Sequence, residues 1–370
     1  MTEKNKLDDL AKNIKAWGQA LGFQQVAIAK PDLDQASERL LQWLDNGFQG
    51  SMQWMGEHGD KRYRVEKLVE NTVRVISVRM DYLTDSNMIA VLKDDNKAYI
   101  SRYALGRDYH KLIRKRLADL TKKIEAEIDN LGLAHLQLNQ RPFVDSAPVM
   151  EKPLAAQAGL GWIGKNTLLL NDKAGSWFFL GEIYISVKLP VDKNHQTNKC
   201  GNCRACLKVC PTDAFPEPYI LDARKCISYL TIESQEPIPL QLRPLMGNRV
   251  FGCDDCQIIC PWNRYSSKTQ EMDFSPRHDL DNSELVTLFE WTEDEFNQKT
   301  EGSPIRRIGY QRWLRNLAVG LGNAPPSERI IGALQHRADD VSPLVREHVQ
   351  WALQEQQRKF GAAKEIPRGE

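Results

Sequence analysis

The chain has 370 residues, a formal net charge of +1 at pH 7, 41% hydrophobic residues and 27% charged residues. This composition is ordinary for a soluble globular protein, and the length suggests two or three domains. No apolar run approaches the roughly eighteen residues that a membrane helix needs. We therefore expect a cytoplasmic monomer with no membrane partner, and the small net charge excludes bulk attraction to polyanions.

Helices and strands alternate through the first half of the chain. Apolar residues at helical spacing predict helices over residues 5–22 and before Gly47, and a long amphipathic helix over Asp108–Leu131. Alternating or β-branched segments predict strands at residues 25–29, 73–80, 134–138, 141–144, 167–170 and 177–188. The pattern predicts a mixed α/β or α+β protein whose first domain, of α/β type, spans residues 1–189.

All eight cysteines lie between Cys200 and Cys260. The first run is Cys200-x2-Cys203-x2-Cys206-x3-Cys210-Pro, the bacterial ferredoxin spacing for [4Fe–4S] clusters. The second run, Cys253-x2-Cys256-x3-Cys260-Pro, lacks its first cysteine, and Cys226 is the candidate to replace it. The ferredoxin crossing rule predicts one cluster held by Cys200, Cys203, Cys206 and Cys260, and a second held by Cys210, Cys226, Cys253 and Cys256.

Zinc and disulfides are the alternatives for these thiols. Structural zinc favours two separated cysteine pairs, whereas the first run places four cysteines within eleven residues. Disulfides need an oxidising compartment, and Met1 is followed by a polar, charged segment without an apolar signal region. We therefore expect two [4Fe–4S] clusters in a ferredoxin-like domain over residues 190–275.

Residues 276–370 read as helical throughout. Apolar faces separated by Gly322, Pro325-Pro326 and Pro343 predict a HEAT-like helical domain. Two segments are basic, although such charge is more often a solvated helix face. Their cations are Arg107, Lys111, Arg114, Lys115, Arg116, Lys122 and Lys123 in the long helix, and Arg306, Arg307, Arg312 and Arg315 near the C-terminal domain.

The stretch Gly159–Asn166 spells G-x-G-x-x-G and nearly matches a P-loop. Both nucleotide motifs need a strand before them and a helix after them. Here a helix is expected before the glycines, over residues 152–158, and a strand after them. Nucleotide binding is therefore rejected, and we expect the glycines to let the backbone approach a large, flat group.

Asp145 follows the strand expected at residues 141–144, an end at which α/β folds place chemistry. Taken alone, such an aspartate more often caps a turn or the next helix, and Glu151 could cap that helix equally well. No two of the seven histidines stand at metal-ligand spacing, and His110 and His348 fit packing or surface roles. The Asp-x-His-x-x-Gly pattern that supplies a cobalt ligand in many cobalamin proteins is absent from the sequence.

With these residues assembled, the chain resembles the epoxyqueuosine reductase family over nearly its whole length. The resemblance rests on the cysteine framework and on three motifs: Ile100–Ala104 with Gly106 and Asp108–His110, Val144–Val149, and Ala158–Thr167. One departure lies after Arg62, where many relatives read Asp-Pro-Arg and this chain reads Arg64-Val65-Glu66.

The resemblance implies a base-off cobalamin in the first domain, without a protein histidine ligand, and Asp145 as the proton donor. It also implies tRNA, bound by its anticodon arm and modified wobble base, as the substrate. Motif position marks Arg62, Arg102, Tyr103, Asp145, Gly161, Lys165 and Asn166 as candidate cofactor contacts.

The implied reaction reduces epoxyqueuosine to queuosine, with electrons passing from a ferredoxin or flavodoxin through the clusters to cobalamin. For the donor role we expect burial to raise the pKa of Asp145. A reductive dehalogenase and a plain two-cluster electron carrier remain the alternatives.

Overall fold

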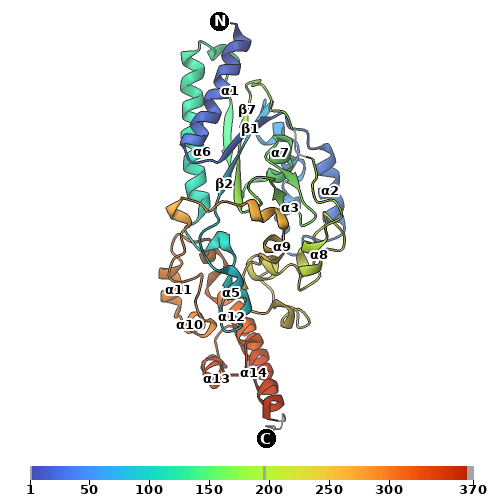
Figure 1. Cartoon of the computed structure of the whole chain (residues 1–370), viewed down its shortest axis with the longest axis vertical. Helices are drawn as coiled ribbons and strands as arrows, with labels where there is room; N and C mark the ends of the chain where they lie inside the picture. Colours follow the sequence, from blue (N-terminus) through green and yellow to red (C-terminus); the bar gives the residue numbers. More distant parts are fainter. Residues whose placement is uncertain (1, 195–196, 365–370) are drawn as a thin grey trace.

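The computed structural model describes residues 2–194 and 197–364. The molecule is elongated, with its two ends at opposite poles (Figure 1). Within the described residues, none of the helices combines the length and apolar character that crossing a membrane requires.

A four-stranded sheet forms the centre of the N-terminal part. Its order is β1-β2-β7-β4, and every neighbouring pair is antiparallel. The strands are β1 (Gln25–Ala29), β2 (Arg74–Asp81), β7 (Phe178–Ile185) and β4 (Gln140–Phe143). The mixed α and β character is confirmed, but the alternation of helices and strands does not build parallel βαβ units.

Helices cover both faces of this sheet. The long helices α1 (Glu3–Ala20) and α6 (Tyr109–Asn130) lie side by side on one face (Figure 1). Asp108 caps the N-terminus of α6, because its carboxylate accepts from the backbone N–H of His110, and the apolar residues Ile113, Leu117, Leu120, Ile124 and Ile128 of this helix are buried. α7 (Glu151–Gln157) and the segment before α2 (Asp34–Asp45) pack on the opposite face, around Val75, Phe143 and Tyr184.

Two strand predictions need correction. Residues 134–138 form no strand, because Ala134–Leu136 make a 3-10 turn and Gln137 has a left-handed backbone. Of residues 167–170 only β6 (Leu169–Leu170) is extended, paired with β5 (Trp162–Ile163). The other short elements before the cysteines are α3 (Trp54–Glu57), η1 (Gly59–Arg62), α4 (Val65–Leu68), α5 (Met88–Lys93), β3 (Tyr99–Ile100) and η2 (Arg102–Ala104).

The cysteine-rich segment consists of short elements and loops. They are α8 (Ala205–Val209), η4 (Ala223–Lys225), the π-helical turn η5 (Tyr229–Glu233), η6 (Pro244–Met246), β8 (Arg249–Phe251), α9 (Asp255–Ile258), η7 (Pro261–Tyr265) and η8 (Met272–Phe274). β8 pairs in parallel with β3 from the first half of the chain.

Helices fill the C-terminal region. They are α10 (Leu285–Phe289), α11 (Glu293–Lys299), η9 (Pro304–Ile308), α12 (Gly309–Asn323), α13 (Glu328–Gln335) and α14 (Pro343–Lys364). The largest apolar core joins α12 and α14 to Phe251 and to Ile100 and Leu105. Residues from all three expected domains therefore share one core.

Candidate functional site

A cavity of about 550 Å³ opens where the sheet domain meets the cysteine-rich and C-terminal segments. Its wall combines aromatic and charged side chains, among them Trp54, Tyr103, Tyr109, His110, Asp145, Glu233, Phe251, Arg307 and Arg312. This volume falls within the range typical of ligand and cofactor pockets.

Asp145 lies at this cavity, in the loop between β4 and α7. Its side chain is 52% exposed, and its Oδ2 lies 3.1 Å from His110 Nε2. The Tyr109 hydroxyl donates a hydrogen bond to the same oxygen. The Asp145 backbone has a φ of 50°, in the left-handed region that a residue with a side chain seldom adopts.

The expectation of a raised pKa for Asp145 is wrong. Burial alone would raise the pKa, but hydrogen bonds from His110 and Tyr109, with the charges of His110 and Arg307, lower it below its usual value. For His110 the opposite holds. Burial alone would lower the pKa, but its hydrogen bonds to Asp108 and Asp145 raise it. The pair therefore favours a carboxylate on Asp145 and a proton on His110.

His110 is held from both sides. Its Nδ1 lies 2.8 Å from Asp108 Oδ1, and its ring is only 5% exposed. Arg307 of η9 donates to the other oxygen of Asp108 at 2.8 Å, and together these contacts lower the pKa of Asp108 to about 2 although burial would raise it. His110 is buried, as the expected packing role predicts, and both of its ring nitrogens also lie beside carboxylates, those of Asp108 and Asp145.

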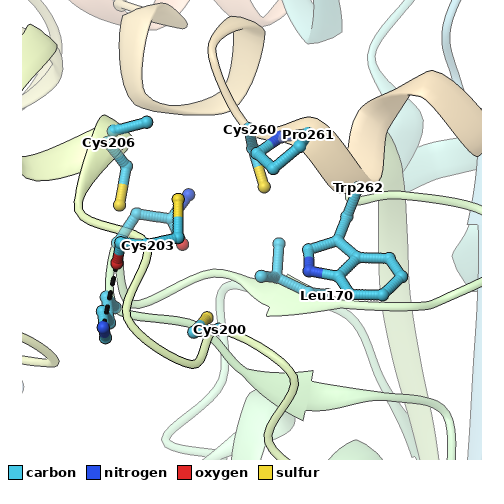
Figure 2. A pocket seen from close by; sticks show the side chains of 10 residues that line it. Leu170, Cys200, Cys203, Cys206, Cys260, Pro261 and Trp262 are labelled. Atoms are coloured by element: carbon cyan, nitrogen blue, oxygen red, sulfur yellow. Dashed lines mark hydrogen bonds between the residues drawn. The ribbon is translucent and has the colours of Figure 1, made fainter.

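The second feature is a small pocket lined by Cys200, Cys203, Cys206 and Cys260. Figure 2 shows three of these thiols on the first cysteine loop and Cys260 on the segment that faces it, next to Trp262. Burial and the neighbouring thiols raise the pKa of Cys206 to about 11. The four thiols line one pocket, and four cysteines at this spacing are the donor set of a [4Fe–4S] cluster.

The remaining thiols, those of Cys210, Cys226, Cys253 and Cys256, are partly buried. Burial raises the pKa of Cys256, and so do the nearby thiols of Cys226, Cys206 and Cys210. The fourth cysteine of this expected set, Cys253, donates from its thiol to Asp255 Oδ2 at 2.7 Å. The structure thus brings the first expected set of four into one pocket and three members of the second set into mutual electrostatic contact.

Several residues that were expected to contact the cofactor instead make close contacts within the chain. Lys165 donates to the carbonyls of Gly201 and Cys203 at 2.5 and 2.9 Å, and Asn166 to that of Cys256 at 3.2 Å. At Gly161 a Cβ would lie 2.1 Å from the Leu170 carbonyl oxygen, so the backbone there approaches the chain's own β6. Lys165 and Asn166 therefore position the cysteine loops, and direct cofactor contact by these three residues stays a prediction.

Arg62 and Arg102 are buried behind the cavity wall. Arg62 donates to the carbonyls of Trp54 and Met55, each at 3.0 Å, and stacks over the Trp54 ring. Arg102 is 1% exposed and donates to Ile100 O at 2.6 Å. Of the expected cofactor contacts, Tyr103 and Asp145 line the large cavity.

The second basic segment is smaller than the sequence suggested. Arg315 is fully buried and donates to the carbonyls of Leu230, Ser234 and Glu236. Its expected place in a surface patch is wrong, because three backbone oxygens in the cysteine-rich segment need its donors. Arg306 and Arg307 remain exposed, as do Arg107, Lys111 and Arg114 beside or on α6.

Comparison with known proteins identifies the family. The protein-family model described as epoxyqueuosine reductase QueG matches residues 62–146. A second family model, described as a 4Fe-4S double cluster binding domain, matches residues 199–263. An epoxyqueuosine reductase of Pseudomonas aeruginosa is 60% identical over 345 residues, which cover 93% of this chain and 94% of the relative. The enzyme of Escherichia coli K12 is 54% identical over 357 residues, which cover 96% and 92%.

A solved structure has the same fold. The crystal structure of an epoxyqueuosine reductase with a tRNA-Tyr epoxyqueuosine-modified stem loop matches with a TM-score of 0.85 at 22% identity, over 98% of this chain and 96% of that chain. The sequence relatives, at more than half identity over almost their whole length, settle the family. The chain belongs to the epoxyqueuosine reductase family and is an oxidoreductase.

Proposed function

We propose that this chain reduces epoxyqueuosine to queuosine at the wobble position of tRNA, with a base-off cobalamin in the large cavity and two [4Fe–4S] clusters that supply it with electrons. The observation that carries the proposal is the placement of Asp145, held at the cavity by Tyr109 and His110. Opening the epoxide to an alkene consumes two electrons and two protons and releases water.

Cobalamin, when bound, supplies the low-potential reductant that the C–O bond requires. The aromatic wall formed by Trp54, Tyr103 and Phe251 suits a large flat group. Both nitrogens of His110 face carboxylates of the protein, which supports a cofactor bound without a histidine ligand from this residue.

Residues of the chain deliver the proton to the epoxide oxygen. As the C–O bond breaks, negative charge develops on the epoxide oxygen, and a positioned acid must remove it. The raised pKa of His110 favours a protonated imidazole, whose Nε2 lies 3.1 Å from Asp145 Oδ2. We propose that Asp145 delivers this proton to the oxygen and that Asp108 and Arg307 keep the imidazole ring in place.

The electron route follows from the two groups of thiols. Cys203 is exposed, so the cluster held by Cys200, Cys203, Cys206 and Cys260 faces the surface and receives electrons from an external ferredoxin or flavodoxin. The second cluster lies toward the cavity, because β8, which ends at the lining residue Phe251, leads directly into Cys253.

The tRNA substrate needs a basic surface beside the cavity. Exposed Arg107, Lys111 and Arg114 lie at the start of α6, and exposed Arg306 and Arg307 lie in η9, which contacts that start through the ion pair of Arg307 with Asp108. We propose that these cations bind phosphates of the anticodon arm, with the wobble base extruded into the cavity. The helices α12–α14 complete this surface as a HEAT-like unit.

The test is reduction of tRNA that carries epoxyqueuosine by anaerobically prepared protein supplied with cobalamin. The proposal expects queuosine to form and tRNA affinity to fall steeply with added salt. Reduction of an organohalide instead would favour the dehalogenase, and absence of corrin absorption bands would favour the plain electron carrier.

A further inference from the structure

The backbone at Asp145 is held in a conformation that it would not adopt alone. A residue with a side chain seldom adopts a φ of 50°, and such strain persists only where neighbouring contacts impose it. The contact is specific, because the backbone N–H of Asp145 donates to Glu151 Oε1 at 2.7 Å. Glu151 is the first residue of α7, and its carboxylate thus reaches back across the loop.

Behind Glu151 lies a second carboxyl group. Glu182 sits in the middle of β7, where it pairs with Ser77 of β2 and Phe143 of β4. It is 0% exposed, and among the described residues no N–H or backbone group donates to either of its oxygens. Both of its oxygens lack a hydrogen-bond partner among the described residues, and the carboxyl group of Glu151 is the nearby ionisable group that contributes most to its pKa after burial.

Two adjoining carboxyl groups cannot both carry a charge in such a place. Burial, followed by the nearby Glu151, raises the pKa of Glu182 well above its usual value, and burial raises that of Glu151 to about 7. The other titratable groups facing the pair are Asp145, Lys152 and Tyr184. Lys152 directs its ammonium group to the Thr167 carbonyl at 2.9 Å, so it does not neutralise the pair directly.

We propose that Glu151 and Glu182 form a positioning pair, in which protonated Glu182 donates to Glu151 and ionised Glu151 fixes the Asp145 backbone at the cavity. The pair touches neither substrate nor cofactor and acts through Asp145. The proposal rests on the role of Asp145 given above. Loss of the shared proton at alkaline pH places two charges side by side and releases the loop.

The proposed pair predicts results that a merely structural role of these residues would not produce. In Glu151→Ala the Asp145 N–H loses its acceptor, so kcat falls about tenfold while KM for the tRNA changes little. In the same variant, amide hydrogen exchange of residues 144–150 becomes faster. In wild type the protection of this segment, corrected for intrinsic exchange, falls at alkaline pH. Glu182→Gln keeps a donor to Glu151 but cannot ionise, and protection then persists.

The experiment compares hydrogen exchange and kcat in wild type, Glu151→Ala, Glu182→Gln and the exposed control Glu38→Ala, all with equal iron and corrin content. The proposal of a positioning pair would be refuted if Glu151→Ala left the protection of residues 144–150 unchanged. It would also be refuted if Glu182→Gln lost protection at alkaline pH as wild type does. Full turnover in Asp145→Asn refutes the proposed role of Asp145 instead. The exchange data then still decide whether the pair holds the loop.

Discussion

The cavity and the cysteine pocket are built in opposite ways. The cysteine ligands come from two short runs and the single Cys226 between them, and their spacing along the chain predicts what they hold. The cavity network joins Asp108 and His110 of α6 to Asp145 after β4 and Arg307 of η9, residues far apart in the sequence. We propose that one region carries electrons on ligands whose spacing is visible in the sequence, and that the other moves protons between groups that only the fold brings together.

The comparison also shows how the two regions meet. Asp254, between two cluster cysteines, accepts hydrogen bonds from Tyr99 and Ser101 at 2.8 and 2.6 Å. β3, which contains Tyr99, pairs with β8 just before Cys253. The segment that leads to the cavity residue Tyr103 is thus attached to the cysteine loop. Changes at Asp145 and Cys226, which lie outside this junction, should affect either protons or electrons, but not both.

The largest effect is expected from Asp145→Asn. The amide cannot deliver a proton, so turnover should fall by about 10²–10⁴ while iron content, corrin content and tRNA affinity stay at wild-type values. Single-turnover formation of queuosine, alongside metal analysis, measures this. Turnover near the wild-type rate would remove Asp145 from the mechanism.

A smaller loss, about tenfold to a hundredfold, is expected from His110→Gln, because Asp145 then lacks its proton source. Since contacts raise the pKa of His110, protonated His110 stabilises the fold at pH values below its unfolded pKa. That contribution is lost as the pH rises through the folded pKa. The stability difference between wild type and variant, from denaturant unfolding, should therefore shrink with rising pH. A constant difference would show that His110 stays neutral.

The variant Cys226→Ala should affect electron transfer only. Loss of one cluster leaves about four irons per chain where wild type holds about eight, and the cavity network remains intact. Iron analysis and corrin absorption after anaerobic preparation measure both. Iron equal to wild type would contradict the assignment of Cys226 as a ligand.

The smallest effect is expected from Lys165→Met. Removing the donor to Gly201 and Cys203 should weaken the cysteine loop by about 1 kcal/mol, and the surface cluster should be lost to a chelator about five times faster. The exposed Lys173→Met serves as a control. Equal rates in both variants would mean that Lys165 does not hold the loop.

The same contrast explains what the sequence could predict. The long helix over residues 109–130 and the strands around 25–29 and 74–81 follow from apolar periodicity, and the cysteine assignment follows from spacing. The antiparallel order of the sheet does not, because alternation of helices and strands is compatible with either direction. Nor could periodicity show that Arg315 is buried, since its partners are backbone carbonyls more than 75 residues away.

The acid–base network shows this limit most clearly. A place after a strand and the family resemblance single out Asp145, whereas neither of these singles out His110 or Glu182 for the proposed network. Glu182 lies in an apolar strand, and its burial beside Glu151 depends on the register of β7 with β2 and β4. The one available signal was a charged residue within a β segment that is otherwise apolar on both faces.

The central claim is that one chain holds two iron–sulfur clusters beside a cavity that binds a corrinoid. It is tested most directly by the iron and corrinoid content of full-length protein prepared without oxygen and with cobalamin supplied. We predict about eight irons and one corrinoid per chain. Protein that holds its full iron but binds no corrinoid would contradict the claim.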